Sequence, residues 1–255
     1  QNEGDNIFFI TTDGYRLSLK KRSGAWPEES FSSIIPYKAM NELNKIIQGF
    51  NDEKEVSIII SDKQISFSLD ELLIVSRVIK GQFPDYKKVL PEQSEQTVTV
   101  SRRQFLDACE RASIIAEASN HVIHLFINDK ITLKASAPTL GVFQEDVAFS
   151  NTKGQCDVKI AFNVKLIVEA IKILSSDDIQ IEFNSGLSPC IITEQGNDDY
   201  KYIVMPIRTS DFQKTEAPSS EQATSEQPVA AQESRTEGAQ TSQSGEPVET
   251  PVETQ

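Results

Sequence analysis

The chain has 255 residues and a formal net charge of −13, and this length allows one large domain or two ordinary ones. No run of the sequence approaches the about 18 apolar residues of a membrane-spanning helix, and no signal peptide is visible. The three cysteines are odd in number and far apart, which suits reduced thiols in a cytoplasmic protein better than a disulfide framework.

Residues 7–20 are predicted to form a β-hairpin at the start of the chain. An apolar run precedes Asp13-Gly14, and the alternating run YRLSL follows it. Asp-Gly between two strand-like runs favours a type I′ turn, which needs a positive φ at both central residues. The sequence therefore predicts a type I′ hairpin here.

The sequence beyond the hairpin repeats one pattern three times: a strand, a helix and three further strands. The three copies span residues 31–79, 97–149 and 157–207. Self-similarity of this kind indicates a repeated supersecondary unit. The opening hairpin matches the last two strands of such a unit, so we expect the chain to be truncated inside a repeat.

Helix signals support the alignment of the three copies. Pro36 suits a first helical position, and Asn163 is a good N-cap. Ser101 with Gln104 matches a capping box. Apolar residues recur at helical spacing in each copy: Met40, Leu43 and Ile47; Phe105, Ala108 and Ala112; Ile167, Ile171 and Leu174.

One such unit cannot close a core alone, because its helix and its small sheet need a partner layer. The fold class that we predict is therefore α+β, with repeated strand-helix-three-strand units paired into pseudo-twofold domains. The expected domains are residues 1–83 and 92–209. A linker over residues 84–91 joins them and carries Pro84 and Pro91.

Residues 210–255 have a different composition. Phe212 and three valines are their only large apolar side chains, and they carry nine acids and two bases. So few apolar residues cannot offset the entropy of ordering, and we predict a disordered acidic tail. Subtracting its net −7 from the −13 of the chain leaves −6 for the remainder. This balance argues against an ordinary tight nucleic-acid binder, but not against a protein that segregates its charges.

Four stretches carry a resemblance to a known family: TTDGYRL, GQFPDYKKVLP, FNVKLIVEAI and YIVMPIR. In this order and at this spacing, the sequence resembles the β subunit of bacterial DNA polymerase III, the sliding clamp, over about residues 5–208. The resemblance implies the DNA clamp fold, in which each subunit has three domains and two subunits close head to tail into a ring. This chain would hold the later part of the middle domain and all of the C-terminal one.

The same resemblance implies a non-catalytic processivity factor of the replicative polymerase. Its partners would be duplex DNA, bound without sequence preference, and the polymerase, clamp loader and repair proteins, bound through short linear motifs. We expect a homodimer when the subunit is full length, a cytoplasmic location, and neither cofactor nor metal.

The three predicted helices share a charge pattern when they are aligned by their starts. Each carries a cation at one position, Lys38, Arg103 and Lys165, and an acid four residues later, Glu42, Asp107 and Glu169. Spacing alone favours a solvated face with i,i+4 pairs. A base in the first turn opposes the helix dipole, however, and suits a phosphate. The resemblance implies that these helices face the duplex, with Lys38 and Lys165 as the first candidates, followed by Lys45, Arg102, Arg103, Arg111 and Lys172.

The resemblance also implies a groove for partner peptides where the hairpin, the linker and the last strand meet. Its lining would be Thr12, Gly14, Tyr15, Arg16, Leu17, Pro84, Val89, Ile203, Val204 and Met205. A neighbouring subsite would use Asn163, Leu166, Leu187, Ile207 and Arg208. The alternative for Ile203, Met205 and Ile207 is ordinary strand core. Leu166 and Tyr15 stand where the enterobacterial clamp has an aromatic residue and a histidine.

The second predicted helix ends in Ile114-Ile115, where clamps of this family place apolar residues of the subunit contact. The alternative is that one of these two side chains is buried in the core.

Two other classes of function compete with a clamp. An enzyme would need an acid-base or metal site, but adjacent acids such as Asp177-Asp178 lie in turn-like contexts. His121 and His124 are three apart in a predicted strand and would make a poor chelate. A protein-interaction scaffold that does not encircle DNA is the other alternative.

Overall fold

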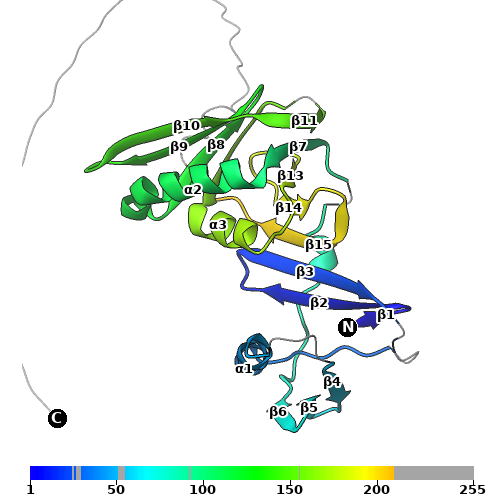
Figure 1. Cartoon of the computed structure of the whole chain (residues 1–255). Helices are drawn as coiled ribbons and strands as arrows, with labels where there is room; N and C mark the ends of the chain where they lie inside the picture. Colours follow the sequence, from blue (N-terminus) through cyan, green and yellow to red (C-terminus); the bar gives the residue numbers. More distant parts are fainter. Residues whose placement is uncertain (25, 27–29, 51–54, 92, 155, 210–255) are drawn as a thin grey trace, which may run out of the picture. The chain divides into compact units, whose positions relative to one another are not determined.

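The computed structural model describes residues 1–209 except 25, 27–29, 51–54, 92 and 155. Its helices and strands follow one another along the chain as Figure 1 labels them. The predicted tail, residues 210–255, lies outside the described residues. The predicted domain boundaries stay a prediction.

The chain starts with an antiparallel hairpin, formed by β1 (Asn2–Glu3), β2 (Asn6–Thr12) and β3 (Arg16–Ser23). The predicted type I′ turn is wrong, because φ is positive at Gly14 (88°) but not at Asp13. The Asp13 carboxylate instead accepts hydrogen bonds from the backbone N–H groups of Tyr15 (3.0 Å) and Arg16 (3.1 Å). An Asp side chain that accepts a hydrogen bond from the backbone N–H two residues on forms an Asx-turn.

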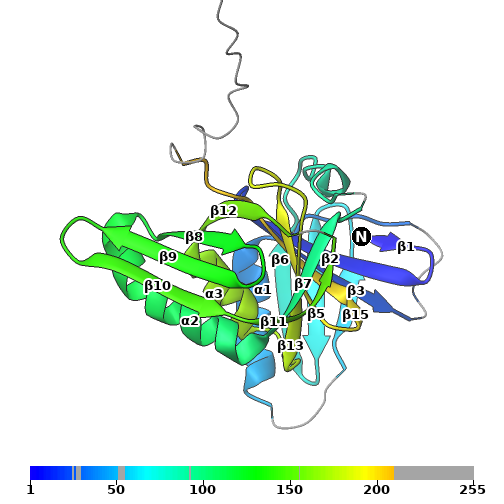
Figure 2. The same cartoon turned by 90° about the horizontal axis from the view of Figure 1, so that it is seen from above.

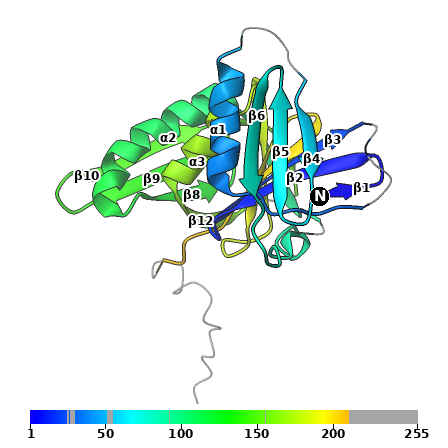
Figure 3. The ribbon, with the colours of Figure 1, turned by 90° about the horizontal axis from the view of Figure 1, so that it is seen from below.

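The first repeat contains α1 (Tyr37–Gln48), β4 (Ser57–Ile60), β5 (Gln64–Leu69) and β6 (Leu72–Arg77). The three strands form their own sheet in the order β4-β5-β6, and α1 lies beside β6 (Figure 3). Leu43 of α1 packs with Ile65 and Phe67 of β5. Ile47, which the helical spacing placed in the buried stripe, is exposed.

The strand predicted just before α1 does not form. Residues 31–36 belong to no strand, and Pro36 precedes the helix instead of opening it. In the other two repeats this first strand pairs with the sheet of the neighbouring repeat: β7 (Gln96–Ser101) with β13 (Asp178–Phe183), and β12 (Val158–Asn163) with β8 (Val122–Ile127). The described part of the chain offers residues 31–36 no such partner strand.

The second and third repeats form as predicted. The second contains β7, α2 (Arg102–Ala116), β8, β9 (Ile131–Ala137) and β10 (Gly141–Val147). The third contains β12, α3 (Val164–Lys172), β13, β14 (Cys190–Glu194) and β15 (Asn197–Val204). Short 3-10 turns lie at Tyr86–Lys88 and Glu117–Ser119. A further strand, β11 (Phe149–Lys153), follows β10 and pairs with β7, which the sequence did not predict.

Exchange of the first strands builds two sheets around one core. The smaller has the order β10-β9-β8-β12, and α2 packs on β9 and β10 (Figure 2). The larger runs β1-β2-β3-β15-β14-β13-β7-β11. The predicted helix stripes lie in the core between them, among them Phe105, Ala108, Ile167 and Ile171.

The larger sheet joins the opening hairpin to the third repeat. β3 pairs antiparallel with β15, and Leu17 lies opposite Ile203. One face of this junction is covered by the linker, because Leu17, Tyr86, Ile191 and Ile203 form a separate buried cluster. The junction therefore has covered residues on both faces of β15.

The helix caps differ between the second and third repeats. Asn163 caps α3 as predicted, since its side chain accepts a hydrogen bond from the Lys165 N–H (3.0 Å). The capping box at Ser101 does not form. The Arg102 N–H instead donates to the carbonyl of Asp177 (2.8 Å), so a neighbouring loop satisfies one of the free N–H groups at the start of α2.

Candidate functional site

The segment after β15, residues 205–208, is held between two elements that are distant in sequence. The Met205 N–H donates to the carbonyl of Tyr15 in the hairpin loop (2.9 Å). The Ile207 N–H donates to the carbonyl of Ala161 in β12 (2.8 Å). The hairpin and β12 therefore flank the segment and fix its path.

A loop between β13 and β14 adds a further side chain. A Cβ at Gly186 would lie 2.1 Å from the carbonyl oxygen of Lys159, so the loop lies directly against the backbone of β12. This contact brings Leu187 to the same strand that binds Ile207. Glycine is the residue that allows such a close approach of two backbones.

Four apolar side chains lie along these contacts: Tyr15, Leu187, Met205 and Ile207. Tyr15 is 72% exposed, Leu187 51% and Met205 38%, while Ile207 is half-buried. We call these four residues the apolar surface. Exposed apolar residues that lie together on rigid elements are typical of a site for another molecule.

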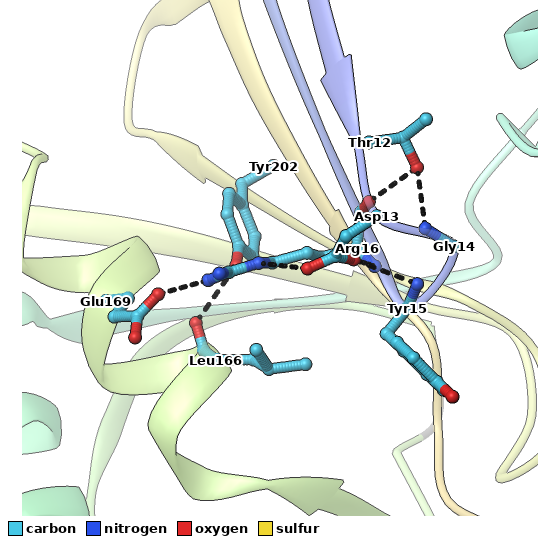
Figure 4. Close-up of polar contacts among 8 residues, drawn as sticks. All are labelled: Thr12, Asp13, Gly14, Tyr15, Arg16, Leu166, Glu169 and Tyr202. Atoms are coloured by element: carbon cyan, nitrogen blue, oxygen red, sulfur yellow. Dashed lines mark hydrogen bonds and ion pairs between the residues drawn. The ribbon is translucent and has the colours of Figure 1, made fainter. Parts of the chain in front are cut away.

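Polar contacts join the hairpin to the third repeat beside the apolar surface (Figure 4). Arg16 donates from Nε to Asp13 Oδ2 (3.0 Å) and from Nη1 to the hydroxyl of Tyr202 (3.2 Å). Nη1 also donates to a carboxylate oxygen of Glu169 in α3, and the Tyr202 hydroxyl donates to the carbonyl of Leu166 (3.2 Å). We call Asp13, Arg16, Glu169 and Tyr202 the Arg16 cluster.

The hydrogen bonds and burial of the Arg16 cluster shift the pKa values of its side chains. The bond to Glu169 is the largest cause of the raised pKa of Arg16. Burial alone would raise the pKa of Asp13, but the hydrogen bonds from Tyr15 and Arg16 together lower it. Burial raises the pKa of the Tyr202 hydroxyl, which therefore stays protonated and can donate to Leu166.

The predicted groove residues divide by exposure. Seven are exposed: Thr12, Gly14, Tyr15, Pro84, Leu187, Met205 and Arg208. Five are half-buried: Arg16, Val89, Asn163, Leu166 and Ile207. Three are buried: Leu17, Ile203 and Val204.

The three buried residues do not line an open surface. Val204 is 0% exposed in the main core, and Ile203 is 1% exposed in the cluster under the linker, with Leu17. Alternate residues of a strand point to opposite faces, and at this junction both faces are covered. For Ile203, the alternative of strand core was therefore right.

Other residues of the site were not predicted. In the sequence, Glu169 is marked only as the acid four residues after Lys165, and Tyr202 only as the first residue of the stretch YIVMPIR. Their common partner Arg16 lies 153 and 186 positions away, so no local spacing signals the contact. Ala161 contributes a backbone carbonyl, which the sequence does not mark.

The structure separates the predicted DNA-facing cations into two groups. Lys38, Arg103 and Lys165 are each the second residue of their helix and are exposed. None of them makes an ion pair with the residues that the structure describes, so the expected i,i+4 pairs are absent there. Their charges remain available to another molecule.

The other four cations already have protein partners. Lys45 pairs with Glu42 (2.7 Å) and Lys172 with Glu110 (2.7 Å). Arg111 makes two hydrogen bonds with Glu145 (2.8 and 2.5 Å), which are the main cause of the lowered pKa of Glu145. Arg102 donates from Nε to the carbonyl of Ser176 (2.7 Å) and is half-buried.

Ile114 and Ile115 lie near the end of α2. Ile114 is exposed, while Ile115 packs against the core. One of the two is thus turned to the core and the other is available for a contact.

Neither a metal centre nor a membrane span is found among residues 1–209 as far as they are described. No group of three or more His, Cys, Asp or Glu side chains there could hold a metal ion. No helix there is both long and apolar enough to cross a bilayer.

Family models cover the described chain almost end to end. Residues 1–85 match the central domain of the DNA polymerase III beta subunit, and residues 87–208 match its C-terminal domain. The chain belongs to the DNA polymerase III beta subunit family. The predicted resemblance is therefore confirmed.

A relative of this beta-subunit chain is the beta sliding clamp of Staphylococcus aureus (strain Mu50). The two are 32% identical over 207 residues, which cover 80% of this chain and 54% of that protein. The chain thus spans about half the length of the curated relatives it matches.

Solved sliding clamps confirm the predicted clamp fold. The Bacillus subtilis DNA polymerase sliding clamp superposes with a TM-score of 0.76 at 29% identity, covering 82% of this chain and 55% of that one. The Pseudomonas aeruginosa sliding clamp bound to griselimycin gives a TM-score of 0.76 at 26% identity, covering 82% and 56%.

Proposed function

We propose that this chain is part of a ring-shaped sliding clamp that encircles duplex DNA in the cytoplasm. The ring is a non-catalytic processivity factor that tethers the replicative polymerase, the clamp loader and repair proteins. The observation that carries the proposal is the apolar surface, which the C-terminal segment forms with the hairpin and β12.

Partner proteins bind the apolar surface through short linear motifs with apolar anchors. A few exposed apolar side chains on fixed backbone give weak to moderate affinity, so one partner can replace another. The flanking hydrogen bonds of Met205 and Ile207 support this role, because they hold the surface ready before a partner arrives.

The helices face the DNA. Lys38, Arg103 and Lys165 repeat at one position in three helices without a protein counterion among the described residues. A lysine or arginine at a helix start suits a phosphate, and phosphate contacts carry no sequence information. These three cations, on a chain of net charge −13, favour weak contacts that permit sliding.

The full-length subunit closes the ring as a homodimer. Ile114, exposed on α2, contributes apolar area to the contact between subunits. Ile115 supports it from the core side.

Substitution of Met205 tests the proposed surface. We expect Met205→Ala to weaken binding of a labelled peptide from the organism's own replicative polymerase about tenfold, because an apolar anchor contact is lost. Fluorescence anisotropy titration measures the affinity. The melting temperature should stay unchanged, since Met205 is partly exposed.

Val142→Ala is the matched control, because Val142 is an exposed apolar residue of β10 outside the surface. It should leave the affinity unchanged. Equal affinity of the wild type and Met205→Ala would refute the peptide surface, whereas a parallel loss in Val142→Ala would show a non-specific hydrophobic effect and refute it too.

A further inference from the structure

Arg16 keeps part of its hydrogen-bonding capacity free. Nε and Nη1 donate to Asp13, Glu169 and Tyr202. Nη2 has no acceptor among the described residues, and the side chain is 29% exposed. An arginine has five N–H donors in a fixed fork, so two of them remain available at Nη2.

The bonds already made fix the direction of this free edge. Asp13 comes from the hairpin loop, Glu169 from α3 and Tyr202 from β15, so three elements hold one planar group. Such a group is oriented before a partner binds, and little conformational entropy is lost when it donates.

The charge around Arg16 is not balanced. Two carboxylates, Asp13 and Glu169, contact one guanidinium, and both are partly exposed. The cluster therefore carries one surplus negative charge. A third carboxylate at Nη2 would be repelled by this net negative charge, whereas a neutral oxygen would not be repelled.

We infer that Glu169 is a specificity-determining residue of the peptide site. The partner segment presents a neutral oxygen acceptor to Arg16 Nη2, either a main-chain carbonyl or an Asn or Gln amide, and Glu169 excludes an acidic side chain at that position. This inference rests on the proposed peptide-binding function.

A peptide scan tests the inference. The probes are octapeptides with two leucine anchors, in which each remaining position carries Asn or Asp in turn. At one position the wild type should bind the Asn form about fivefold more tightly than the Asp form, as expected for one net charge at about 4 Å in water. Glu169→Gln should remove this preference, and high salt should reduce it in the wild type.

Glu110→Gln is the matched control, because it removes the same charge from an exposed acid on α2 that pairs with Lys172. It should keep the preference, and the melting temperature of Glu169→Gln should show that the variant folds. A preference that survives in Glu169→Gln, or tighter binding of Asp than of Asn at every position, would overturn the inference alone.

The inference and the proposed function fail in different ways. Peptides that bind and respond to Met205→Ala, but show no charge preference linked to Glu169, overturn only the inference. If none of the peptides binds, both are overturned.

Discussion

Glu194 shows how a single residue ties two elements of the third repeat together. Its carboxylate accepts hydrogen bonds from the N–H groups of Ser175 (2.6 Å) and Ser176 (3.3 Å), and from the amide of Asn197 (2.7 Å). The backbone bond from Ser175 is the largest cause of a pKa lowered to about 2. The end of α3 is thereby joined to the turn between β14 and β15.

This contact predicts a pH dependence. Since the pKa of Glu194 in the folded state lies below its ordinary value of 4.5, the stabilisation is complete above about pH 4.5 and is lost as the pH falls toward 2. Glu194→Gln should lower the free energy of unfolding by about 1 kcal/mol at pH 7 and by less at pH 3.

Urea unfolding at both pH values measures the effect. Asp199→Asn, at an exposed acid in β15 whose side chain makes no hydrogen bond with the described residues, is the control and should show no such difference. A loss of stability in Glu194→Gln that is equal at pH 7 and pH 3 would contradict the assigned role.

The contacts of some residues could be predicted from the sequence, and those of others could not. Asn163 was predicted as the N-cap of α3, because capping depends on neighbours two or three residues away. The contact between Arg16 and Glu169 could not be predicted, because it depends on the pairing of β3 with β15. Local chemistry was thus predictable, while contacts across the fold were not.

At the scale of elements, Gly186 is the point where the loop between β13 and β14 meets β12. A Cβ there would lie 2.1 Å from the Lys159 carbonyl oxygen, so Gly186→Ala forces the loop away from the strand. We expect a loss of about 1 to 3 kcal/mol in the free energy of unfolding and weaker peptide binding, because Leu187 moves with the loop. Denaturant titration and anisotropy measure the two effects.

Gly24→Ala provides the comparison for Gly186→Ala. A Cβ at Gly24 would make only ordinary contact with the Trp26 ring, at 3.5 Å. This variant should be close to neutral in both assays. Wild-type stability in Gly186→Ala would contradict the close approach of loop and strand.

Helices and strands could be predicted where they form from contacts within a single repeat. Helix spacing placed Phe105 and Ile167 correctly in the core. The strand predicted at residues 31–36 failed, because a first strand is completed by the neighbouring repeat. The burial of Ile203 and Val204 was not evident from the sequence either. Ile203 is buried in the cluster under the linker and Val204 in the main core, so each depends on contacts with distant parts of the chain.

At the scale of the whole molecule, the repeat explains how the charges are distributed. The equivalent cations Lys38, Arg103 and Lys165 lie at the same position of three helices. The other four candidate cations on these helices pair with nearby acids or donate to a carbonyl. In the proposed clamp, a chain that is acidic overall presents these three cations to DNA, so that the duplex is held weakly while topology prevents its loss.

The central claim is that the full subunit encircles DNA, and its retention on DNA tests this most directly. The labelled full-length protein is loaded by its clamp loader onto nicked circular DNA, and the bound fraction is measured by gel filtration before and after a restriction enzyme linearises the circle. We predict that the protein stays on the circle and leaves after linearisation, because a ring slides off a free end. Equal retention on both forms, or no retention on the circle, would contradict the clamp and favour a scaffold that does not encircle DNA.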